Sequence, residues 1–92
     1  MHNGNKNILN RVFDSIEKFR TKQINADDMV ANLSGNISAL EGVTQEFIDN
    51  FHGFIGEIDF IKYTKNSNLV DDLILKEVND YDSYLRKYFS NR

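Results

Sequence analysis

The chain has 92 residues, of which 40% are hydrophobic, with a net charge of -3 and neither cysteine nor proline. This length suits one domain, because a second core would have too few residues to bury, and we expect a single helical domain over residues 1–92. The missing cysteines exclude disulfides and thiolate metal sites. The acidic balance, without a basic face, argues against direct nucleic-acid binding.

The N-terminal residues 1–6 are polar and lack the apolar stretch of a signal peptide, so we expect them to be disordered. No apolar run in the sequence reaches the length of a transmembrane helix, and we expect no membrane contact. A small chain without disulfides is typical of a reducing compartment. The sequence therefore predicts a soluble, cytoplasmic protein.

Two helices are expected in the first half of the chain. The first runs from about Asn7 to Lys22, with its apolar residues at helical spacing on one face. The second starts at Asn25, whose side chain suits an N-cap, and ends before Gly42, which we interpret as a C-terminal stop. Gly35 lies inside this second helix and makes a kink or break plausible there.

Two further helices are expected in the second half. Thr44 is the expected cap of a third helix with a broad Phe and Ile face, and a fourth helix follows a polar turn and runs to about Phe89. Glu77 falls within the apolar face of the fourth helix, so we expect it to pair with a Tyr, Lys or Arg, or the helix to bend nearby. All connections are short, which predicts an all-α protein, an antiparallel up-down four-helix bundle.

The sequence shows no set of residues spaced for catalysis or metal binding. His52 stands alone on the third helix, and His2 lies at the terminus, so we expect no metal site and no cofactor. No nucleophile with a base and no glycine-rich phosphate loop is visible. The acidic pair Asp71 and Asp72 is expected in the first turn of the fourth helix, where the helix dipole explains both carboxylates. We therefore expect a protein that is not an enzyme.

The back of the third helix is one candidate partner-binding surface. Asp49, Gly53, Gly56 and Phe60 share this side, opposite the Phe and Ile face. The two glycines would let another chain approach closely over an aromatic floor. The alternative is structural: neighbouring helices of the same bundle contact this helix on two sides.

The outer flank of the fourth helix is a second candidate. Asp71, Leu75, Val78 and Asp82 fall close together on the helical wheel. Carboxylates alternating with apolar groups suit a basic protein surface, since the charges orient the partner and the apolar groups are buried. The alternative is a solvated acidic edge with one exposed leucine, which is normal for a soluble protein.

A family resemblance follows from the helix-turn-helix opening and from the step into the long third helix. The residues concerned are Phe19-x4-Ile24-x3-Asp28 and Leu40-Glu41-x5-Phe47. With its small size and acidity, the chain resembles the all-helical immunity proteins that bacteria make against their own toxins, of the colicin and contact-dependent growth inhibition type. The resemblance implies a cytoplasmic inhibitor of a cognate toxin, often a basic nuclease, in a one-to-one complex with a protein encoded by a neighbouring gene.

Two other functions remain open at this point. The chain could be a homo-oligomeric structural or adaptor bundle, for example a homodimer. Its self-interface would then lie at Gly53, Gly56 and Phe60. It could also be a phage-encoded inhibitor of a host nuclease or defence complex, which shares the physics of the immunity protein and differs in target. In all three cases the expected partner is a protein.

Overall fold

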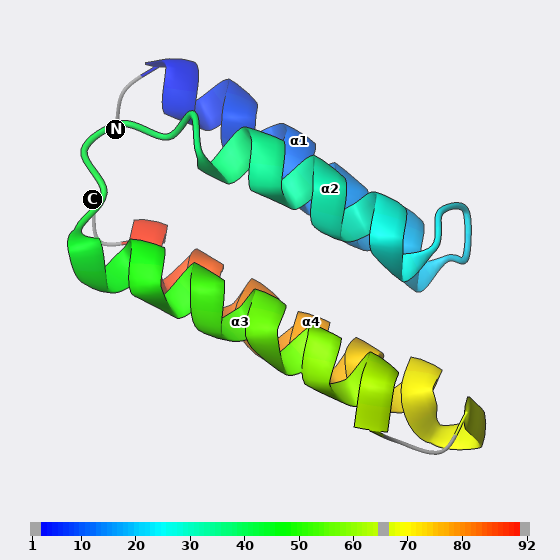
Figure 1. The fold of residues 1–92 in the computed structure, drawn as a ribbon. Helices are drawn as coiled ribbons and strands as arrows, with labels where there is room; N and C mark the ends of the chain where they lie inside the picture. Colours follow the sequence, from blue (N-terminus) through cyan, green and yellow to red (C-terminus); the bar gives the residue numbers. More distant parts are fainter. Residues whose placement is uncertain (1–2, 65–66, 91–92) are drawn as a thin grey trace. The chain divides into compact units, whose positions relative to one another are not determined.

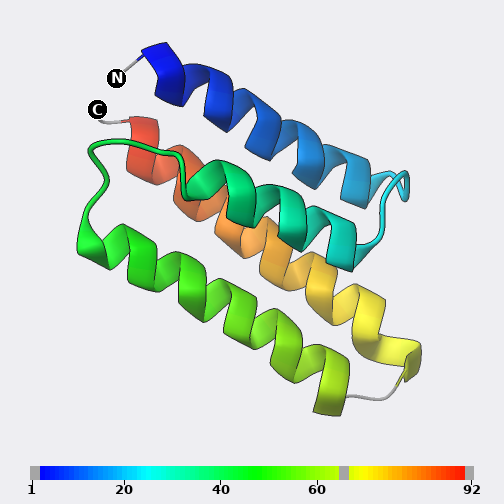
Figure 2. The same ribbon diagram turned by 45° about the horizontal axis from the view of Figure 1, so that its top comes forward.

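The computed structural model describes residues 3–64 and 67–90, and in this part of the chain all regular secondary structure is α-helical. Its four helices are α1 (Asn3–Arg20), α2 (Ala26–Ile37), α3 (Gln45–Thr64) and α4 (Ser67–Ser90). The chain divides into two compact units, one ending at Val43 and the other beginning at Thr44. Each unit is a hairpin of two antiparallel helices, α1 with α2 and α3 with α4 (Figures 1 and 2). The expected all-α class is confirmed.

The N-terminal hairpin buries one apolar stripe from each of its helices, as the spacing of the sequence predicts. Val12 and Ile16 on α1 and Met29 and Leu33 on α2 are almost completely buried. Leu40, which follows α2, is also buried. Across the edge of this hairpin, Arg11 Nε donates a hydrogen bond to Asn36 Oδ1 at 2.9 Å.

The first helix begins four residues earlier than expected, at Asn3 instead of Asn7. Asn5 explains part of the difference: its Nδ2 donates to the carbonyl oxygen of Glu41 at 2.7 Å, and the Glu41 N–H donates to Asn5 Oδ1 at 2.9 Å. Asn5 is buried, so these two bonds satisfy polar groups that would otherwise be costly. Residues 3–6 are therefore helical, and residues 1 and 2 of the expected disordered segment lie outside the described residues.

The first helix ends at Arg20, two residues before the expected Lys22, and Lys22 follows it as a left-handed residue that is not glycine. Lys22 has a φ of 64°. The Gln23 N–H donates to the carbonyl oxygen of Lys18 at 2.8 Å, and the Lys22 N–H donates to that of Phe19 at 3.1 Å. This pair of bonds is the Schellman pattern, in which glycine normally occupies the left-handed position.

The second helix begins where we expected and ends earlier than we expected. Asn25 is the N-cap, and its side chain accepts from the Asp28 N–H at 2.8 Å. The helix continues through Gly35 without a break and ends at Ile37. Gly42 is therefore not the residue that stops it. Its φ of 72° instead lets the connecting segment turn after the helix has ended.

The C-terminal hairpin is held by an aromatic core and closed at one end by Tyr88. Thr44 caps α3 as expected, since its Oγ1 accepts from the Phe47 N–H at 3.1 Å. The Thr44 N–H donates to the Tyr88 hydroxyl at 3.1 Å, and the rings of Phe47 and Tyr88 lie 4.6 Å apart between centroids. These contacts join the first turn of α3 to the last turns of α4.

The fourth helix is continuous over its 24 residues. Because it begins at Ser67, no acidic residue lies in its first turn. The expected dipole compensation by Asp71 and Asp72 is therefore wrong, since that effect is confined to the first turn.

Candidate functional site

A groove of about 490 Å³ lies between the two helices of the C-terminal hairpin. Each helix contributes four residues at positions i, i+3, i+4 and i+7, which place them on one face. The lining residues are Asn50, Gly53, Phe54 and Glu57 from α3, and Glu77, Asp80, Tyr81 and Tyr84 from α4. The groove is thus made by two matching helical stripes that face each other.

Stacked aromatic rings form the apolar part of the groove. Phe54 and Tyr81 lie nearly parallel, with centroids 4.4 Å apart and planes inclined by 10°. Tyr81 and Tyr84 continue the series at 5.9 Å and 22°. Tyr84 is half-buried, so part of its ring remains open to solvent beside the carboxylates. Aromatic faces carry partial negative charge and attract cations.

The hydroxyl of Tyr81 is a buried polar group without a partner. Tyr81 is only 3% exposed, and within the described residues its hydroxyl oxygen forms no hydrogen bond. Burial, and to a smaller extent the nearby Tyr84, raises the pKa of this hydroxyl well above its ordinary value. Leaving a hydroxyl buried and unpaired costs roughly 1–3 kcal/mol, which is unusual in a well-packed core.

Three carboxylates surround these rings. Neither Glu57 nor Glu77 forms a hydrogen bond or ion pair with any residue in the described part of the chain. Asp80 accepts from Lys76 at 3.3 Å, but both side chains are largely exposed, and such pairs contribute little. The pairing that we expected for Glu77 is therefore not found: the residue is half-buried and lines the groove.

Gly53 keeps the α3 side of the groove open. A Cβ atom at this position would meet no atom within 4 Å, apart from its own helix backbone. Of the four residues expected on the back of α3, only Gly53 lines the groove. Asp49 and Gly56 are exposed elsewhere on the helix, and Phe60 is 52% exposed. Asp49 accepts a hydrogen bond from Gln45 Nε2 at 2.9 Å.

The expected stripe on the outer flank of α4 is only partly at the surface. Asp71 is exposed and Leu75 is half-buried. Val78 has no exposed surface, because it lies four residues after Ile74 and three before Tyr81, on the same buried face. A continuous exposed stripe through Val78 is therefore wrong.

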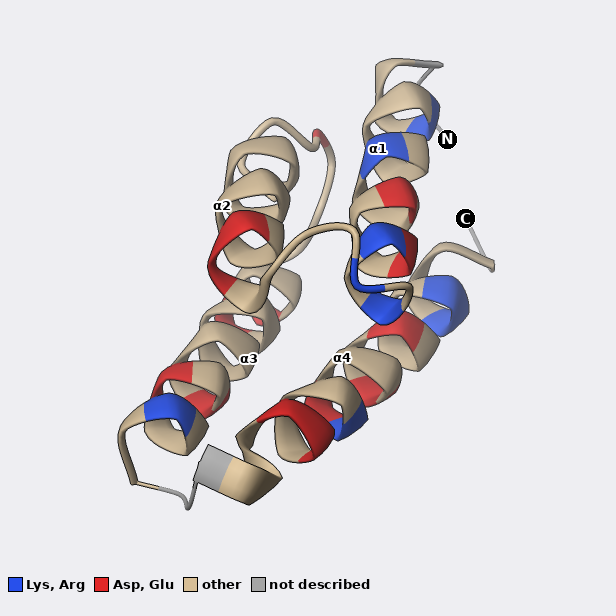
Figure 3. Cartoon of the chain, turned by 90° about the vertical axis from the view of Figure 1, so that its right-hand side faces the viewer, with Lys and Arg blue, Asp and Glu red and all other residues tan. Residues whose placement is uncertain are grey.

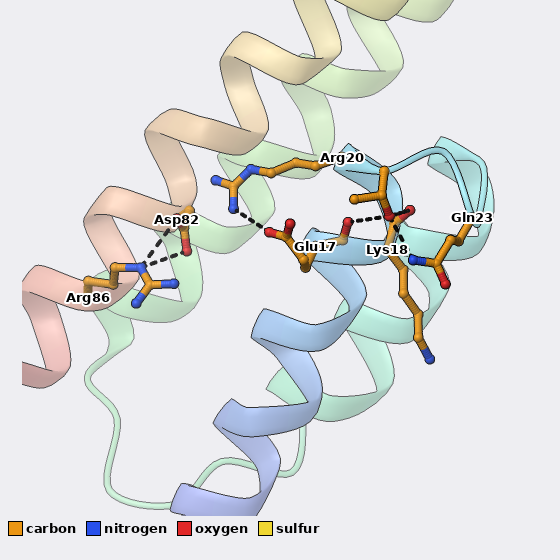
Figure 4. A network of polar contacts seen from close by, with 7 residues as sticks. Glu17, Lys18, Arg20, Gln23, Asp82 and Arg86 are labelled. Carbon is orange, nitrogen blue, oxygen red and sulfur yellow. Dashed lines mark hydrogen bonds and ion pairs between the residues drawn. The ribbon is translucent and has the colours of Figure 1, made fainter.

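Asp82, the last member of that stripe, is also buried, with 8% of its surface exposed. Arg86 Nε donates to its two carboxylate oxygens at 3.2 and 3.3 Å (Figure 4). A second polar contact within one helix, between Arg20 and Glu17 at 3.4 Å, lies at the end of α1 and appears in the same view. Asp82 thus has an internal counterion and is less available to a partner than the carboxylates of the groove.

The sequence contained a signal for the groove residues that were missed. Asn50, Glu57, Asp80, Tyr81 and Tyr84 share two repeated i, i+3, i+4, i+7 patterns with residues already noted. Polar residues at such positions, between apolar ones, indicate a helix face that is partly open. What the pattern does not indicate is that the two faces meet.

The described residues contain no cluster of three or more His, Cys, Asp or Glu side chains placed to hold a metal ion. His52 is exposed on α3, where its ring lies 6.3 Å from that of Phe51. Over the same described residues, none of the helices combines the length and the hydrophobicity that crossing a membrane requires.

Comparisons with models of known protein families, with curated proteins and with solved structures find no match. The chemistry of the groove is therefore the basis for its interpretation. Carboxylates beside aromatic faces suit the binding of an organic cation that also has an apolar part.

Proposed function

We propose that the chain is a non-catalytic inhibitor that binds a basic protein, and that the partner docks on the groove between α3 and α4. In its specific form, the proposal is that of an immunity protein that neutralises a cognate bacterial toxin in the cytoplasm. The observation that carries it is the pair of carboxylates, Glu57 and Glu77, that have no counterion in the described structure and flank an aromatic wall.

The distribution of charge supports a docking surface on the C-terminal hairpin. Residues 44–92 contain nine acidic and six basic residues, whereas residues 1–43 contain five of each, so the net charge of -3 belongs to the C-terminal unit. Figure 3 shows acidic segments along both α3 and α4, among fewer basic ones. A local excess of negative charge speeds association with a basic partner and orients it.

The groove also supplies buried aromatic surface, which adds binding affinity that charge alone does not provide. Surface ion pairs contribute little to affinity, because both partners remain hydrated. Carboxylates that adjoin the rings of Phe54, Tyr81 and Tyr84 become desolvated when a partner covers them, and aromatic anchors are typical of the centres of protein interfaces. An acidic domain that covers the nucleic-acid cleft of a basic toxin would exclude its substrate.

The fold proposal that accompanies this function is an up-down four-helix bundle made of the two hairpins in one domain. Short connections join consecutive helices, with α1 and α2 separated by residues 21–25. Antiparallel packing of sequential helices follows from such connections.

The experiment is a rescue and binding assay with the protein encoded by the neighbouring gene. Two double variants reverse two charges each: Glu57→Lys with Glu77→Lys in the groove, and Asp59→Lys with Asp72→Lys at exposed positions on the same helices. Both double variants change the net charge equally, so any difference in partner binding between them reports where the partner docks.

We expect the wild-type chain and the exposed double variant to form a one-to-one complex and to restore growth. We expect the groove variant to lose both properties. Calorimetry should also show weaker binding at higher salt, because screening reduces the electrostatic attraction. Equal binding by the two double variants would remove the groove as the docking site.

A second function has one observation in its favour, the exposed aromatic residues of α3. Phe60 is 52% exposed and Tyr63 is 81% exposed, and Gly56 one turn earlier is open. Such residues suit a self-interface of an adaptor bundle. Sedimentation distinguishes the two: a monomer at all concentrations excludes the homo-oligomer.

A further inference from the structure

We propose that the groove between α3 and α4 is a receptor for one arginine side chain, which the protein partner inserts between Glu57 and Glu77. This inference rests on the proposed function, because the arginine is taken to belong to the basic partner. It adds the chemical identity of the group that the groove recognises.

The size and lining of the groove suit a single elongated side chain. Its volume of about 490 Å³ lies within the range of roughly 300–1,000 Å³ that is typical of sites for small molecules. Phe54 offers an apolar surface for the methylene groups of an arginine, and Gly53 leaves space beside it. The guanidinium group could then reach the carboxylates while the stem packs on the rings.

The unpaired polar groups of the groove call for a ligand with several donors. Within the described residues, Glu57 and Glu77 have no hydrogen-bond partner, and neither does the buried hydroxyl of Tyr81. The hydroxyl oxygen is enclosed, so the two carboxylates are the groups that are open to a ligand in the groove. A guanidinium group has five N–H donors, enough for both carboxylates.

Arginine fits this set better than lysine. A guanidinium group is planar, binds carboxylates through two parallel hydrogen bonds, and stacks on aromatic faces such as that of Tyr84. The lysine ammonium is a strongly hydrated point charge with three donors, and loses more hydration when it enters a groove. A metal ion fits less well, because the described residues offer no cluster of three metal-binding side chains.

The test is an NMR titration of the full chain with acetyl-Gly-Arg-Gly-amide, using the lysine peptide for comparison. We expect millimolar binding, with chemical-shift changes centred on Gly53, Glu57, Glu77 and Asp80, and at least tenfold weaker binding of the lysine peptide. The Glu57→Gln, Glu77→Gln variant should bind the arginine peptide at least tenfold more weakly. The matched variant, Asp59→Asn with Asp72→Asn, should bind it within twofold of the wild-type affinity.

Three results would overturn the inference: no binding of the arginine peptide, shift changes away from the groove, or equal binding of both peptides. The far-ultraviolet circular dichroism of each variant shows that it is folded. Failure of this inference is distinguishable from failure of the proposed function. If partner binding depends on Glu57 and Glu77 but the peptide does not bind, the assignment of arginine is wrong and the docking site stands. If the arginine peptide binds but partner binding does not depend on either carboxylate, the proposed docking site is wrong and the arginine site stands.

Discussion

Replacing Tyr81 with phenylalanine should stabilise the fold, even though Tyr81 is 3% exposed and belongs to the core. The hydroxyl that is removed has no hydrogen-bond partner within the described residues. The ring that remains keeps its stacking on Phe54, at 4.4 Å between centroids. Since an unpaired buried hydroxyl costs roughly 1–3 kcal/mol, we expect a gain of about 1 kcal/mol in the free energy of unfolding. For a chain of this size that corresponds to a rise in melting temperature of roughly 4–8 °C.

Tyr88→Phe is the matched control, because it makes the same change about two turns further along α4. The Tyr88 hydroxyl accepts from the Thr44 N–H at 3.1 Å, so its removal should cost about 0.5–1.5 kcal/mol. Thermal and urea unfolding followed by circular dichroism measure both variants. A Tyr81→Phe chain that is less stable than the wild type would refute the reasoning about the hydroxyl.

Three further predictions concern stability. Because burial raises the pKa of Tyr81 in the folded chain, ionisation of this hydroxyl favours the unfolded chain: the free energy of unfolding is unaffected below about pH 10, the ordinary pKa, and decreases above it by up to about 1.4 kcal/mol per pH unit. Urea unfolding at pH 9 and 11 should show this extra loss in the wild type and not in Tyr81→Phe. Asn5→Ala should cost about 1–3 kcal/mol, because it leaves the N–H and carbonyl of Glu41 unpaired; an unchanged urea midpoint would contradict the two bonds. Lys22→Gly should stabilise by up to about 1 kcal/mol, because glycine adopts a φ of 64° without strain, and a lower melting temperature would contradict this.

The starts of the central helices were predictable because their signals are local. Asn25 and Thr44 each cap a helix through a bond to an N–H three residues later. The residue type and the helical period that follows are sufficient to recognise such a cap. The existence of all four helices follows from the same periodicity.

The ends of α1 were less predictable, for two different physical reasons. Its first turn includes Asn5, which bonds to Glu41, 36 residues away, and no local pattern indicates a contact of that range. Its C-terminal end at Arg20 is followed by Lys22, a residue type that rarely adopts the left-handed conformation. The glycine that the sequence does offer as a stop, Gly42, lies beyond the end of α2.

The candidate site was partly predictable. Gly53 and Glu77 stood out because each departs from what its helix face should contain, and both line the groove. Val78 was assigned to the wrong face, since its neighbours at helical spacing, Ile74 and Tyr81, are core residues. The groove itself required knowing which faces of α3 and α4 meet, and that is a property of packing between helices.

The most direct test of the docking groove is photo-crosslinking of the complex with the neighbouring-gene protein. A photoreactive amino acid is placed at Gly53 in one chain and at Gly35 in another, since at both positions a side chain meets open space. Gly35 lies in α2, outside the groove, and serves as the matched control. We expect a covalent adduct from position 53, mapped by mass spectrometry to a peptide of the partner that contains arginine, and no adduct from position 35. An adduct from position 35 with none from position 53 would contradict the central claim.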